Sequence, residues 1–157
     1  VPSETVEKFK VFNSLSRNEK LELREVLNLF VISLNNYAMS TSRSGTNTQE
    51  GLRSINTALE IFPGQPQLLD TRALVYISLG NHVAAIEDAT EAIKSNSTNL
   101  SFKMTLVEAY ILAGDFSSAR PLLETVSDQN EMSLTPSTTL RSEIKELERK
   151  ILRGKAA

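Results

Sequence analysis

The stretch Ala73–Ile93, ALVYISLGNHVAAIEDATEAI, contains two apolar segments separated by Gly80-Asn81-His82. On both sides of this tripeptide, apolar residues recur at intervals of three and four, which indicates two amphipathic helices. Glycine adopts the left-handed conformation that ends a helix, and an asparagine side chain can accept hydrogen bonds from the free amides of the next helix. The stretch therefore predicts a helix hairpin.

The same pattern returns 34 residues further along the chain. Five residues have identical counterparts at this interval: Thr71, Tyr76, Ile77, Gly80 and Ala85 recur as Thr105, Tyr110, Ile111, Gly114 and Ala119. A fixed period of this length indicates stacked copies of one unit that cannot bury its apolar face alone. The two alanines are small where the helices of each hairpin have to approach closely. In the second turn, Asp115 replaces Asn81 as the expected cap.

The N-terminal part continues the helical pattern less regularly. A short helix is expected around Val6 and Phe9, and a capping box at residues 16–19 predicts a helix over 17–39. The apolar stripe of this long helix is broad, so we expect contacts on two of its sides. Its members are Leu23, Val26, Leu27, Leu29, Phe30, Val31, Ile32, Leu34 and Tyr37. The polar segment 40–48 predicts a loop.

Two further apolar stripes flank the repeats. The first, which Pro63-Gly64 ends, consists of Leu52, Ile55, Ala58, Leu59 and Phe62. The second follows Pro136 and consists of Leu140, Ile144, Leu147 and Ile151. Because charged residues surround this second stripe, it predicts a helix that covers the end of the array with a polar outer face.

These residues resemble the tetratricopeptide repeat family, in which an aromatic and a small residue on the first helix are joined to a small residue and an alanine on the second. The unit 66–99 matches this pattern at Ala73, Tyr76, Gly80, Ala85 and Ala92, and departs from it at Leu69, Arg72 and Ser97. The unit 100–133 matches at Leu106, Tyr110, Gly114 and Ala119, and departs at Val126. The resemblance implies an all-α fold, a right-handed superhelical array of antiparallel helix hairpins with a C-terminal capping helix.

Five parts are expected along the chain. Residues 1–46 form N-terminal helices of an irregular or degenerate repeat, and 47–65 contain the second helix of a partial repeat. Residues 66–99 and 100–133 are the two clear repeats, and 134–157 form the capping helix. The sequence begins with Val-Pro-Ser and has no initiator methionine or signal peptide pattern, so we expect a fragment of a larger protein or a processed chain.

Composition argues against several functions. The 17 basic and 19 acidic residues give a net charge of −2, which offers no field for a nucleic acid. The longest apolar stretch, 27–34, is far shorter than the roughly 20 residues of a membrane span. With no cysteine and one histidine, His82, neither a metal site nor a cofactor is expected. The acids Glu87, Asp88 and Glu91 are interpreted as a hydrated helix face, and no catalytic residues are expected.

The resemblance also implies a concave groove, lined by the first helix of each repeat, that holds a peptide or a partner helix. By register, its candidate residues are Gln67, Asp70, Leu74, Ile77, Met104, Glu108 and Ile111. Family members that clamp a chaperone's C-terminal carboxylate carry Lys and Asn on this face, where this sequence has Asp70 and Leu74. Because an acid repels a carboxylate, that type of clamp is not expected.

The sequence therefore predicts a non-catalytic scaffold for protein or peptide binding. The alternative is an accessory or regulatory domain of a larger protein or enzyme, which docks within its own chain or mediates self-assembly. Neither the partner nor the compartment follows from the sequence, although the cytoplasm is the default expectation. Whether the groove is open or covered by the N-terminal helix also stays open.

Overall fold

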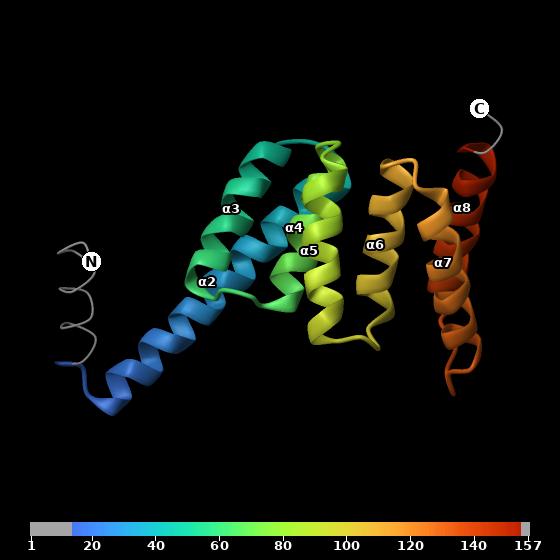
Figure 1. Cartoon of the computed structure of the whole chain (residues 1–157). Helices are drawn as coiled ribbons and strands as arrows, with labels where there is room; N and C mark the ends of the chain where they lie inside the picture. The colour runs from blue at the N-terminus through green and yellow to red at the C-terminus, as the bar shows by residue number, and fades with distance from the viewer. Residues whose placement is uncertain (1–13, 155–157) are drawn as a thin grey trace. The chain divides into compact units, whose positions relative to one another are not determined.

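A computed structural model describes residues 14–154, and all regular structure in this range is helical (Figure 1). The helices are α2 (Arg17–Ser44), α3 (Thr48–Ile61), α4 (Pro66–Ser78), α5 (His82–Ser95), α6 (Leu100–Leu112), α7 (Phe116–Glu131) and α8 (Thr138–Gly154). The chain divides into two compact units, residues 1–33 and 34–157, and the division falls within α2. The short helix expected around Val6 and Phe9 lies outside the described residues. None of the helices from 14 to 154 has the length and apolar character that crossing a membrane requires.

The first unit is represented by residues 14–33, where α2 begins with the predicted capping box. The Ser16 N–H donates to Glu19 Oε2 at 2.8 Å, and the Glu19 N–H donates to Ser16 Oγ at 3.3 Å. The expected burial of the helix on two sides is wrong for much of its stripe. Four of its apolar side chains are 49–66% exposed, and these are Val26, Leu29, Phe30 and Ile32. Periodicity identifies an apolar face, but only a neighbouring element can bury it.

In the second unit, α2 continues through most of the segment that was expected to be a loop. The Thr41 and Ser42 hydroxyls donate to the carbonyls of Ala38 and Met39, each at 2.8 Å. These bonds satisfy the hydroxyls within the helix, so a polar composition does not end it. The turn is confined to a few residues, in which Gly45 has φ 68° and Asn47 has φ 53°.

A close helix crossing follows this turn. Gly51 of α3 is buried against α2, and a Cβ atom at this position would overlap the Thr41 Oγ1 and lie 3.5 Å from the Cα of Ala38. Ala38 is itself fully buried. Glycine in a helix interior costs about 0.5–1 kcal/mol relative to alanine, and here it permits the contact between the two backbones.

The two helix hairpins have the predicted turns. Gly80 and Gly114 adopt φ values of 75° and 74°, which end α4 and α6 in the left-handed region. The Asn81 side chain then accepts a hydrogen bond from the Ala84 N–H at 3.2 Å. The Asp115 carboxylate accepts one from the Ser118 N–H at 3.1 Å. Both predicted caps are confirmed, and each begins the second helix of its hairpin.

Helices α3 to α8 follow one another side by side, and α6 additionally contacts α4 and α8 (Figure 1). Small residues occupy the closest contacts, since Ala73, Ala85, Ala89, Ala92 and Ala119 have no exposed surface. At the C-terminal end, Ile144, Leu147 and Ile151 of α8 join a core cluster with residues of α6 and α7. The predicted role of this helix as a cap is confirmed. The loop before it is held by the buried Asn130, whose amide oxygen accepts the Ser137 N–H at 2.9 Å.

The acidic group on α5 corrects a sequence expectation. Glu87 and Glu91 are exposed, but Asp88 is buried and forms a bidentate ion pair with Arg72 of α4, at 2.6 and 2.8 Å. The same guanidinium donates to Asn56 Oδ1 of α3 at 3.1 Å. Arg72 therefore links three consecutive helices, which explains an arginine at a position where the family prefers leucine. A helical pattern cannot show that one acid of the group faces a cation on another helix.

We predict that Gly51→Ala destabilises the protein despite the higher helix propensity of alanine. The added methyl group would collide with Thr41, and overpacking of this kind costs about 1–3 kcal/mol. Urea denaturation measures the change in the free energy of unfolding. The double variant Thr41→Ala/Gly51→Ala removes the colliding hydroxyl and should recover much of the loss. Equal destabilisation of both variants would show that the crossing is not limited by this contact.

We also predict that Asp88→Ala lowers the free energy of unfolding by about 1–3 kcal/mol, because a partly buried guanidinium loses its partner. Glu87→Ala, at the exposed neighbouring position, is the matched control and should change stability by less than about 0.5 kcal/mol. The same urea titrations measure both variants. Indistinguishable midpoints would contradict a stabilising role for the ion pair.

Candidate functional site

A groove of about 350 Å³ lies within the second unit, between the end of α2 and helices α4, α6 and α8. Its apolar part is formed by Leu74 and Ile77 of α4 and Met104 of α6. Four hydroxyl groups also line it, those of Ser42, Ser78, Ser101 and Thr105, together with the charged residues Arg43, Glu108 and Glu143. The groove thus combines an apolar surface with hydrogen-bonding groups, a combination that is typical of binding sites.

The structure places the seven candidate residues in four different environments. Leu74, Ile77, Met104 and Glu108 line the groove together. Gln67 is exposed on the first turn of α4, outside the lining. Ile111 is half-buried and packs against the core cluster that α6, α7 and α8 share, so its side chain is part of the core. Asp70, the seventh, is buried next to the groove.

Asp70 is the least satisfied polar side chain of this region. It is 6% exposed, and its Oδ1 atom has no hydrogen-bond partner. Burial raises the pKa of the Asp70 carboxyl to about 6, although hydrogen bonding with the Thr105 side chain acts in the opposite direction. Thr105 itself lines the groove, so Asp70 lies directly behind the groove wall. A buried carboxylate without full hydrogen bonding is costly to the fold.

Three carboxyl groups share this part of the structure. Burial raises the pKa of Glu108, the Lys150 ammonium opposes that shift, and the carboxylates of Glu143 and Asp70 reinforce it. These three acids come from three different helices, α6, α8 and α4. Among residues 14–154, no group of histidine, aspartate or glutamate side chains is arranged to hold a metal ion. The carboxylates therefore influence one another electrostatically without forming a ligand shell.

Sequence reasoning missed several residues of the groove. Ser42 and Arg43 were assigned to a loop, but they belong to the last turn of α2. Glu143 was assigned to the solvated face of the last helix, and it reaches the groove because α8 packs beside α6. The 34-residue period does not identify it, because that period pairs Glu143 with the fully buried Ala109, whereas α8 begins 38 residues after α6.

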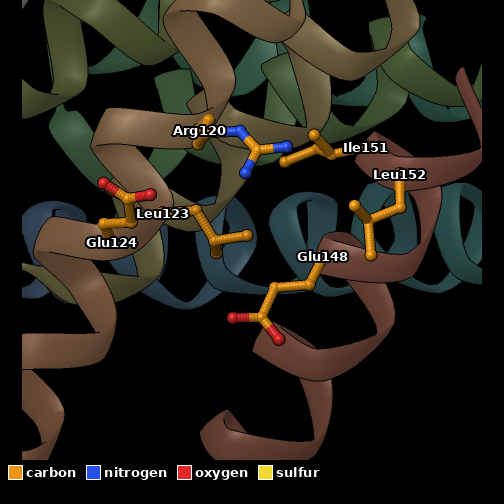
Figure 2. A pocket seen from close by; sticks show the side chains of 6 residues that line it. All are labelled: Arg120, Leu123, Glu124, Glu148, Ile151 and Leu152. Atoms are coloured by element: carbon orange, nitrogen blue, oxygen red, sulfur yellow. The ribbon is translucent and has the colours of Figure 1, made fainter. Parts of the chain in front are cut away.

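A second hollow of about 160 Å³ lies between α7 and α8 (Figure 2). Its lining consists of Arg120, Leu123, Glu124, Glu148, Ile151 and Leu152. Leu123 and Ile151 are core residues with almost no exposed surface, and the Nε atom of Arg120 is buried without a hydrogen-bond partner. Figure 2 shows the Arg120 guanidinium extending toward Ile151. We interpret this hollow as imperfect packing of the capping helix, because Leu123 and Ile151 in its lining belong to the core that α7 and α8 share.

Comparisons with known proteins agree with this architecture. Residues 76–135 match the family model of the tetratricopeptide repeat. The sequence has no significant match among curated proteins.

Three solved structures illustrate the similarity of the fold. The first tetratricopeptide domain of human RPAP3 is 15% identical, with a TM-score of 0.63, and the match covers 82% of this chain and 97% of that one. The Sgt2 domain from Aspergillus fumigatus is 20% identical, with a TM-score of 0.64, covering 81% and 82%. The second RPAP3 domain, solved in complex with the HSP70 peptide SGPTIEEVD, is 16% identical, with a TM-score of 0.61, covering 78% and 98%.

At these identities the solved structures establish a shared fold, and the family model identifies the repeat by its sequence. The helix hairpins, their glycine turns and their buried alanines are the structural counterparts of that match. Residues 76–135 thus match the tetratricopeptide repeat model, and the chain shares the fold of the tetratricopeptide domains of RPAP3 and Sgt2.

Proposed function

We propose that this protein is a non-catalytic interaction scaffold that holds an extended peptide or a partner helix in the groove between α2, α4, α6 and α8. The observation that carries the proposal is the joint placement of Leu74, Ile77 and Met104 on two neighbouring helices, beside four hydroxyl groups whose oxygens can accept hydrogen bonds. Apolar side chains of a partner would pack against these three residues, and the backbone of the partner would form hydrogen bonds with the hydroxyl groups. A peptide complex of a neighbour with the same fold supports this type of function.

The stacked helices explain how such a groove would bind efficiently. Fully buried alanines and closed hairpins hold α4 and α6 in place, so little conformational entropy is lost when a partner is captured. Met104 is only 6% exposed and belongs to the core cluster, so Leu74 and Ile77 provide most of the apolar surface that a partner can reach. Neither histidine nor cysteine lines the groove, so the most common general base and the thiol nucleophile have no counterpart there.

Self-assembly, or docking within a larger protein, is the second candidate function. It is favoured by the exposed apolar side chains in the first half of α2, since large exposed apolar patches commonly mark interaction sites. Sedimentation equilibrium over a range of concentrations tests it. A mass that rises with concentration and returns to that of the monomer in Phe30→Glu would support self-assembly.

We predict that Leu74→Glu abolishes peptide capture while the helical fold is retained. A random nonapeptide library displayed on phage is selected against the wild-type chain, and the affinities of enriched peptides are measured by fluorescence anisotropy. Because a charge would be introduced among apolar contacts, we expect affinity to fall by more than about tenfold. Leu74 suits this test better than Ile111, whose replacement would disturb the core.

Val83→Glu is the matched control, since Val83 is an exposed apolar residue on the first turn of α5 and lies outside the groove lining. It should bind the enriched peptides as the wild type does. Circular dichroism confirms that both variants are equally helical. Enriched peptides that bind wild type and Leu74→Glu equally would place the binding surface elsewhere.

A further inference from the structure

We propose that the groove selects partners carrying a lysine or arginine, whose cationic group is received by the lining carboxylates of Glu108 and Glu143, while the buried Asp70 carboxylate adds to the attraction. The partner class is an extended basic peptide segment in which the cation is flanked by apolar residues. This inference rests on the proposed function, because it assigns the chemistry of the partner to the same groove.

The first support is an excess of acid in and behind the groove. Glu108 and Glu143 are lining residues, and Asp70 lies behind Thr105. The ion pairs observed among the described residues are formed by other acids, namely Asp88, Glu91, Glu131 and Glu146. Lys150 acts on Glu108 only through its longer-range field, and Arg43 contributes one positive charge to the lining. The three acids outnumber the two cations Arg43 and Lys150, so the site keeps an excess of one negative charge when all five groups are ionised.

The second support is independent of the number of acids. Only 6% of Asp70 is exposed, and its Oδ1 atom lacks a hydrogen-bond partner. Folding rarely leaves a buried carboxylate oxygen unsatisfied, because the loss of hydration is costly. By contrast, the equally buried Asp88 is fully paired with Arg72. A partner's ammonium or guanidinium bound in the groove would compensate the buried Asp70 charge electrostatically from outside the chain.

The third support is that apolar residues lie next to the acids on the same helices. Leu74 follows Asp70 by one helical turn, and Met104 precedes Glu108 by one turn, so each acid is placed beside an apolar lining residue. A lysine or arginine has a long apolar stem that can cover such residues while its charged end reaches the acids. An acidic peptide such as SGPTIEEVD, which a neighbour of the same fold binds, would be repelled here.

The test is the composition of the peptides that the phage selection enriches. We expect lysine or arginine at one fixed position beside apolar residues, with no measurable binding of SGPTIEEVD. In Asp70→Asn/Glu108→Gln, the affinity for enriched peptides should fall about 30-fold or more, because a charged group would lose its partners. Replacing the peptide's basic residue by norleucine should cause a similar loss in the wild type and little further loss in the variant.

The outcomes separate the two proposals. Peptides without a basic residue, or basic peptides that the double variant binds unchanged, would overturn the cationic partner; if Leu74→Glu still abolishes their binding, the groove function stands. An unenriched library, or peptides insensitive to Leu74→Glu, would overturn both. Val83→Glu again serves as the control that leaves binding intact.

A pH titration gives a further readout that a purely structural role would not produce. Protonation of Asp70, whose pKa is about 6, should weaken the binding of basic peptides about tenfold between pH 7 and pH 5. Glu108, Glu143, Lys150 and Arg43 are the other charged groups around the groove, and the raised pKa of Glu108 acts in the same direction. In Asp70→Asn this pH dependence should be reduced, and an unchanged profile would contradict a role for Asp70.

Thermal unfolding of the free protein tests whether the charged Asp70 carboxylate destabilises the fold. Because its pKa is raised on folding from 3.8 to about 6, the charged carboxylate destabilises the fold above pH 6, and this cost disappears as the pH falls toward 4. Asp70→Asn should therefore raise the Tm at pH 7.5 and leave it nearly unchanged at pH 4, while it weakens peptide binding. A lower Tm at pH 7.5 would show that Asp70 is a stabilising residue of the fold and would overturn its assignment to the partner.

Discussion

The close approach of helices at residues with little or no side chain is the constraint on which the rest of the structure depends. Ala73, Ala85, Ala89 and Ala92 are fully buried where the helices of the first hairpin and their neighbours meet. At the α2–α3 crossing even a methyl group is excluded, and Gly51 is found there. Interiors are packed too densely to absorb larger side chains, so these positions determine the spacing of the helices. The spacing of the helices also sets the width of the groove, because the residues that line the groove lie on the same helices.

Two buried aspartates of neighbouring helices illustrate how differently a polar group can serve this fold. Asp88 is paired with Arg72, which also bonds to Asn56, so its charge is compensated within the array. Asp70, on the neighbouring helix α4, has one oxygen without a hydrogen-bond partner, and its pKa is raised. The first arrangement connects helices and requires nothing from outside. The second is unfavourable for the free protein, and such local disadvantages are commonly retained where a site serves binding.

Other proteins share the arrangement of the helices, but the chemistry of the groove depends on the side chains of each chain. Domains of human RPAP3 and fungal Sgt2 share the helix arrangement at 15–20% identity. Identity this low means that most side chains differ, so the charge of the groove can differ between proteins that share this backbone arrangement. The shared fold therefore does not specify a partner, whose chemistry has to be inferred from this chain's own carboxylates and apolar residues.

Much of the fold was predictable from the sequence because its determinants are local. The glycine turns, the caps at Asn81 and Asp115 and the stripe of α8 depend on residues within a few positions of one another, and each was found as expected. The repeat period extended these local signals to the stacking of hairpins. Four of the seven candidate groove residues also line the observed groove, since they share a register on the first helices.

Only the tertiary structure decided which of these residues are exposed, paired or buried. The apolar face of α2 is largely uncovered in its first half, Asp88 meets a cation from another helix, and Ile111 turns into the core. Glu143 reaches the groove because α8 packs beside α6. These outcomes depend on contacts between residues far apart in the chain, which periodicity does not specify. The sequence by itself determined a stack of helix hairpins, and long-range packing decided where that stack carries its uncompensated charge.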